Sequence, residues 1–253
     1  MPERTPSPEP LAHPPAVEVI YGLQAVTPAD LEWETVQEVL QHELPDGFRV
    51  DQPIANVNIE VKTVPGSDPA QTRTETWSGV KVVSEDGQVT GHLMRFGLFV
   101  NFGQYAGYDA AIEPVQALWQ AYYQAFRATL VMQLSIRYIN VIRLPFDKDG
   151  RVELADYFQV AIQFPETLAR NLTNFHYQFT IASDQGLPAR IMLSSMREEA
   201  DDLVIAFDNE GAYKSQWQVN DGNIWTAFTQ VRDWTYHIFQ TVLTEKCREE
   251  IKG

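Results

Sequence analysis

The chain has 253 residues, long enough to bury a substantial core, and its 44% hydrophobic and 11% aromatic content is typical of a globular protein. Its 34 acidic residues outnumber the 19 Lys and Arg residues, which gives a formal net charge of -15. Such a charge repels phosphate backbones and attracts basic proteins, so we expect a protein partner rather than direct nucleic-acid binding.

The remaining composition excludes several protein classes. Cys247 is the only cysteine, so neither an internal disulfide nor a thiolate metal cluster can form. The sequence has no apolar run long enough to span a membrane, and its start lacks the basic and apolar regions of a secretory signal. We therefore expect a cytoplasmic protein without membrane contact.

The order of elements begins after a proline-rich start. Residues 1–15 contain six prolines and predict a disordered tail, and residues 16–253 predict a single domain. Residues 16–26 predict a first strand. Residues 27–44 predict an amphipathic helix with Thr27 as its N-cap and Pro28 at its first helical position.

Strands and a second helix complete the first half. Residues 56–64, 75–84 and 92–102 predict three strands. In the last of these, Met94, Phe96 and Leu98 alternate toward one side, which predicts one uninterrupted strand. Apolar residues at three- and four-residue spacing then predict a long helix from Tyr108 to about Phe126.

The second half repeats this order. The expected elements are a long strand at 128–145, short helical pieces within 154–171, strands at 174–183, 189–197 and 202–209, and a helix at 223–251. The fold class predicted is α+β: a curved antiparallel sheet packed by two long helices, with one face free of helices. Residues 16–127 and 128–253 would be topologically similar halves, each strand, helix, three strands, helix.

Polar residues interrupt the apolar strand 136–145, IRYINVIRLP. Alternation places Arg137 and Arg143 on one face and Asn140 on the other. Arg137 is either paired with a carboxylate on a neighbouring strand or binds an anionic ligand on the open sheet, since an arginine fork recognises carboxylate or phosphate bidentately. Asn140 is either a buried amide that satisfies the backbone or part of the same site. Arg137, Asn140 and Arg143 are therefore the candidate ligand- or partner-binding residues.

The same stretch carries a resemblance. Arg137-Tyr138-Ile139-Asn140 in a long strand, with VEVIYGLQ near the start and a final helix after WQVNDGNIW, resembles a sporadically distributed family of uncharacterised bacterial proteins of about this length. The resemblance would cover nearly the whole chain after residue 15. It implies the domain boundaries, and it implies no reaction and no cofactor.

Enzyme signatures are nearly absent. The chain has no phosphate-binding glycine loop, no dinucleotide fingerprint, no His-Glu-x-x-His and no Gly-x-Ser-x-Gly elbow. One pattern, Asp46 or Asp51 followed by Glu60 and Lys62, imitates the carboxylates and lysine of a metal-dependent nuclease. The same residues also form the polar face of an ordinary half-exposed strand. We predict no catalytic residue, no metal and no cofactor.

Three functions follow. The leading prediction is a non-enzymatic cytoplasmic binding protein, with an immunity or antitoxin role toward a basic protein partner as one form of it. The alternatives are a domain that binds a small anionic ligand between sheet and helix, anchored by Arg137, and a metal-dependent nuclease built on Glu60 and Lys62. The oligomeric state is left open.

Overall fold

The structure is a computed structural model that describes residues 15–62, 70–160, 174–198 and 202–252. Within these residues the chain forms one nine-stranded sheet, four α-helices and one short 3-10 helix. The proline-rich stretch 1–14 and most of the helical pieces expected after residue 160 lie outside the described residues. No helix of the described part is long and apolar enough to cross a membrane.

The elements have the following bounds. The strands are β1 (Ala16–Val26), β2 (Phe48–Lys62), β3 (Ala70–Ser84), β4 (Val89–Met94), β5 (Gly97–Phe102), β6 (Leu130–Pro145), β7 (His176–Ala182), β8 (Pro188–Glu198) and β9 (Asp202–Gln218). The helices are α1 (Trp33–Glu43), α2 (Tyr108–Ala125), the 3-10 helix η1 (Leu154–Asp156), α3 (Asn223–Val242) and α4 (Glu245–Lys252).

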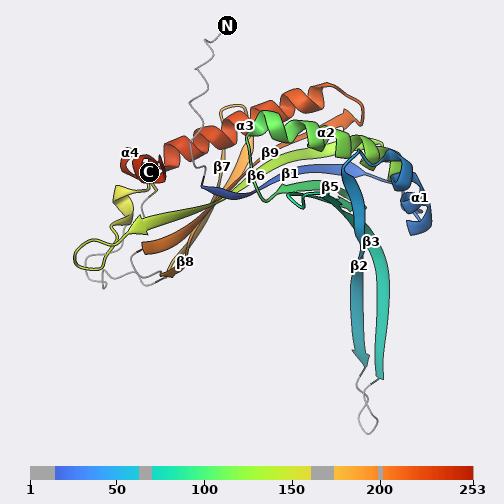
Figure 1. Cartoon of the computed structure of the whole chain (residues 1–253), viewed down its shortest axis with the longest axis horizontal. Coiled ribbons are helices and arrows are strands. Elements are labelled where there is room, and N and C mark those ends of the chain that lie inside the picture. The colour runs from blue at the N-terminus through green and yellow to red at the C-terminus, as the bar shows by residue number, and fades with distance from the viewer. Residues whose placement is uncertain (1–14, 63–69, 161–173, 199–201, 253) are drawn as a thin grey trace.

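The sheet is open and antiparallel throughout. Its strand order is β2-β3-β4-β5-β1-β6-β9-β8-β7, so β1 and β6 lie near the middle and β2 and β7 form the edges. The sheet arches, with α2 and α3 along one face and none of the described helices on the other (Figure 1). The predicted α+β class and the antiparallel sheet are confirmed. We call the helix-free side the open face.

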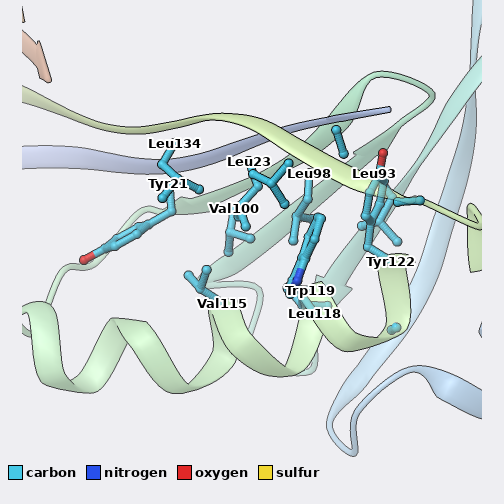
Figure 2. Packing of buried hydrophobic residues seen from close by; sticks show 14 of the residues in the cluster. Tyr21, Leu23, Leu93, Leu98, Val100, Val115, Leu118, Trp119, Tyr122 and Leu134 are labelled. Carbon is cyan, nitrogen blue, oxygen red and sulfur yellow. The ribbon is translucent and has the colours of Figure 1, made fainter. Parts of the chain in front are cut away.

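Strand alternation explains how the covered face forms. On β1, Val19, Tyr21 and Leu23 are fully buried, while the intervening Glu18, Ile20 and Gln24 belong to the open face. Side chains of α2 meet this apolar face, as Figure 2 shows for Val115, Leu118, Trp119 and Tyr122. Two clusters of buried apolar side chains hold the helices on the sheet, one under α2 and the start of α3 and the other under the end of α3.

The β2–β3 hairpin extends beyond the rest of the sheet. β3 pairs with β4 only from Gly79 to Val83, whereas the β2–β3 pairing runs on from Ala55↔Trp77 to Lys62↔Ala70. Residues 55–62 and 70–77 thus form a two-stranded ribbon beside which no other described strand lies, and we call this ribbon the arm. It projects on the side of the sheet away from α2 and α3 (Figure 1).

The strand predicted at 92–102 is wrong in one respect. The structure divides it into β4 and β5, which pair from Val89↔Phe102 to Met94↔Gly97 around a turn at Arg95 and Phe96. Phe96 is 54% exposed at this turn instead of pointing into the core. Apolar residues at alternate positions from Met94 to Phe102 hide the turn in the sequence, but the two-residue turn reverses the faces. Leu93 of β4 lies opposite Leu98 of β5 in the core, whereas Met94, predicted on the same side as Leu98, lies opposite Gly97 on the other face. Gly97 marks the turn, because a Cβ there would collide with the Leu23 carbonyl oxygen.

The predicted start of the first helix is also wrong. α1 begins at Trp33 with Glu32 as its N-cap residue. The Thr27 hydroxyl instead donates to the Arg95 carbonyl oxygen, and the Arg95 guanidinium donates to the Ala29 carbonyl oxygen. These long-range contacts hold the segment before α1 against the β4–β5 turn.

The second half differs from the first more than the sequence pattern predicts. The final helix breaks at Leu243, which pairs with Phe158 in an isolated β-bridge, and α4 follows as a separate helix. Four strands separate α1 from α2, whereas three described strands separate η1 from α3. The two halves are therefore not matched element for element, and their common origin stays a prediction.

Candidate functional site

The Arg137-Tyr138-Ile139-Asn140 stretch sends its side chains to both faces of β6. Arg137 lies opposite Ile20 of β1 and Glu210 of β9 on the open face. Tyr138 and Asn140 lie on the covered face. The motif therefore does not form one site, and its side chains have different surroundings on the two faces.

Arg137 is held by a carboxylate of the neighbouring strand. Its Nε donates to Asp208 Oδ1 at 2.9 Å and its Nη2 donates to Asp208 Oδ2 at 2.6 Å. Asp208 is only 2% exposed, so its charge needs this bidentate partner. The hydrogen bonds to Asp208 in turn raise the pKa of the Arg137 guanidinium above its ordinary value.

A second arginine extends the pair into a cluster. Arg190 of β8 donates to Glu210 Oε2 at 3.0 Å and lies 4.0 Å from Asp208 Oδ2. We call Arg137, Asp208, Arg190 and Glu210 the open-face charge cluster. Two positive and two negative charges cancel within it, so this part of the open face is neutral in a chain of net charge -15.

Asn140 is buried and binds the backbone of the neighbouring strand. Its side-chain amide is 3% exposed and donates to the Phe207 carbonyl oxygen at 2.9 Å. The position lies where the β1–β6 register shifts between Ala16 and Glu18, and such irregularities leave backbone groups that need partners. A buried amide that satisfies the backbone accounts for Asn140.

Arg143 lies further along β6, opposite Val204 of β9, and is exposed. It shares the open face with Arg137. The structure thus brings two of the three candidate binding residues to one face and places Asn140 on the other.

Tyr138 joins a chain of hydroxyl groups under the helices. The Tyr105 hydroxyl lies 3.3 Å from that of Tyr21 and 3.3 Å from that of Tyr138. Burial raises the pKa of Tyr21 and of Tyr138 above the ordinary value, so both side chains stay neutral. These contacts fasten the loop after β5 to the centre of the sheet.

The nuclease-like residues do not converge. Asp51 binds Lys81, with 2.9 Å between Oδ2 and Nζ, at the body end of the β2–β3 hairpin. Glu60 lies nine residues further along the same extended strand, roughly 30 Å away by strand geometry. The side chains of Glu60 and Lys62 lie outside the described set, and among the described residues no group of three or more His, Cys, Asp or Glu could hold a metal ion.

A shallow, solvent-open depression lies between α1 and α2. Its lining comprises Glu43, Pro45, Glu113, Gln116, Ala117 and Gln120. Two of these residues are carboxylates, which would repel an anion. This is not the pocket between sheet and helix that an anionic ligand anchored by Arg137 requires.

The sequence analysis missed the exposure of the arm. Val57, Ile59 and Val61 are 47%, 52% and 58% exposed, and all three belong to one face of the ribbon by strand alternation. Their alternation with polar residues predicted an ordinary half-buried strand. The local sequence did not indicate that these three apolar side chains would stay exposed.

No protein-family model and no curated protein matches this chain. The resemblance to a family of bacterial proteins therefore stays a prediction.

Proposed function

We propose that this chain is a non-enzymatic protein-binding module whose partner docks on the open face of the sheet. The observation that carries this proposal is the wide sheet face on which none of the described helices lies, with the arm projecting on the same side (Figure 1). Antiparallel sheets tolerate one face in water, so the face is stable without a partner and free to receive one.

The chemistry of the open face supports a protein partner. Side chains of the central strands on this face include Ile20, Phe99 and Ile139, which are partly buried and intermixed with the open-face charge cluster. Apolar groups surrounded by paired charges are typical of protein interfaces. Small anions find a weaker site here, because Asp208 already occupies the fork of Arg137.

Net charge narrows the kind of partner. A chain of net charge -15 attracts a basic protein and speeds its association. An immunity or antitoxin role in the cytoplasm, in which the module neutralises a basic protein without contacting nucleic acid itself, belongs to the same proposal. Among the described residues, no assembled set of carboxylates supports the nuclease alternative.

Native mass spectrometry of the tagged protein, purified gently from its own host, tests the proposal. Gln24 is exposed on the open face of β1, and Gln120 is exposed on the outer side of α2. We expect a stoichiometric protein partner that Gln24→Arg loses and the matched control Gln120→Arg retains. A bound small molecule in place of a protein, or equal retention by both variants, would contradict docking on the open face.

A further inference from the structure

The arm leaves a long strand edge unpaired. β2 is an edge strand, so one side of its backbone from Ala55 to Lys62 has no neighbouring strand in the sheet. A two-stranded ribbon is at best marginally stable in water, whereas three or more strands are stable. An added strand along this edge would therefore stabilise the arm.

A proline and two register shifts protect the body end of β2 against strand addition, and neither device recurs in the arm. Near the body, Pro53 has no N–H to donate, and the β2–β3 register shifts between Val50 and Gln52 and between Ile54 and Ala55. Prolines and bulges are the usual means by which proteins block strand addition. From Ala55 to Lys62 the register runs without a shift, so the edge open to pairing begins where the arm begins.

The apolar residues of this edge are palindromic. An antiparallel partner related by a twofold axis through Ile59 brings Ile59 opposite the partner's Ile59. The same axis brings Val57 opposite the partner's Val61, and Val61 opposite the partner's Val57. Each of these three exposed apolar side chains then meets another β-branched apolar side chain on the same face.

Charge also favours a second copy at this position. The arm carries Glu60, Lys62, Arg73 and Glu75, so its formal charge is zero although the chain carries -15. Eight strand residues separate the two bodies by roughly 25 Å, well beyond the screening length of about 8 Å at physiological salt. Pairing through the arms therefore avoids the repulsion that any closer contact between two acidic bodies would meet.

We propose that two copies of this chain pair antiparallel along the arm edge of β2, with Ile59 at the twofold axis, to form a dimer with a continuous four-stranded ribbon between the bodies. This inference does not depend on the proposed function, because it is argued from the edge of β2 and not from the open face. An interface of this size is small, so we expect a reversible dimer with a dissociation constant in the range of about 10 to 100 μM.

Sedimentation equilibrium of the full chain, from about 1 to about 300 μM, measures this association. We expect the average mass of the wild type to rise from the monomer value of 28.8 kDa toward twice that mass. Ile59→Lys should remain monomeric across the range, since it places like charges opposite each other at the axis. Ile59 is 52% exposed, so the substitution leaves the fold intact, as circular dichroism will verify.

Two further samples make the test specific. Phe96→Lys, at a side chain that is 54% exposed on the β4–β5 turn, is the matched control and should dimerise as the wild type does. An equal mixture of Ile59→Lys and Ile59→Asp should recover the dimer, because only a twofold axis at this residue brings the two charges together. A wild type that stays monomeric, a dimer that survives Ile59→Lys, or a mixture that stays monomeric would each overturn the proposal.

Discussion

The two ends of the β2–β3 hairpin carry the same kind of side chain in opposite surroundings. Val80 and Val82, at the body end, are fully buried in the cluster that includes Leu40 of α1 and Leu118 of α2. Val57 and Ile59, in the arm, are 47% and 52% exposed. Strand alternation decides which residues share a face, but only a covering helix decides whether that face is a core.

The largest expected contrast between body and arm is in thiol chemistry. Cys247 of α4 is fully buried, and burial raises the pKa of its thiol to about 12. A cysteine introduced as Val57→Cys in the arm should keep an ordinary pKa. At pH 8 we expect alkylation at position 57 to be about a thousandfold faster than at Cys247, because the thiolate is the reactive form.

Iodoacetamide labelling followed by peptide mass spectrometry reads both sites in one sample. Denaturant provides the control, since both thiols should then react alike. Similar rates in the folded protein would mean that α4 unfolds locally often enough to expose Cys247 as fully as position 57.

Ion pairs give the next contrast. Arg137 neutralises Asp208, which is 2% exposed, so Arg137→Ala leaves a buried carboxylate without its main partner. We expect a loss of about 3 kcal/mol in the free energy of unfolding, measured by urea denaturation. Arg73 and Glu75 of the arm lie 3.5 Å apart with 65% and 59% of their side chains exposed.

Arg73→Ala is the matched control for Arg137→Ala. It should change the free energy of unfolding by less than about 0.5 kcal/mol, because exposed pairs are screened by water. Equal losses for the two variants would remove the distinction between the open-face charge cluster and a surface ion pair.

Side-chain truncation gives the smallest contrast. Val80→Ala should destabilise the fold by about 2 kcal/mol, through lost burial and the cavity left behind. Val57→Ala should cost less than about 0.5 kcal/mol in the monomer. Chemical denaturation at a concentration near 1 μM, where the proposed dimer dissociates, measures both. A cost at Val57 equal to that at Val80 would show that the arm is covered in solution.

The sequence predicted the face of the sheet on which Arg137 lies, but not the group that binds its side chain. Alternation placed Arg137 and Asn140 on opposite faces of one strand, and the structure agrees. It offered two readings of Arg137, an ion pair with a neighbouring strand or an anion site, and the structure supplies the ion pair. Asp208 is 71 residues away along the chain, so no local pattern could identify it as the partner.

Local periodicity predicted most of the strands and the amphipathic helices, and with them the α+β class, because periodicity depends on nearby side chains. Composition alone determined the acidic character of this protein. Tertiary structure decided the rest. It set the turn at Phe96, because apolar residues continue at alternate positions of the sequence on both sides of the turn, although the turn reverses which of these positions face the core. It also decided that Val80 is core while Val57 is exposed, because cover by a helix is a contact between segments distant in sequence.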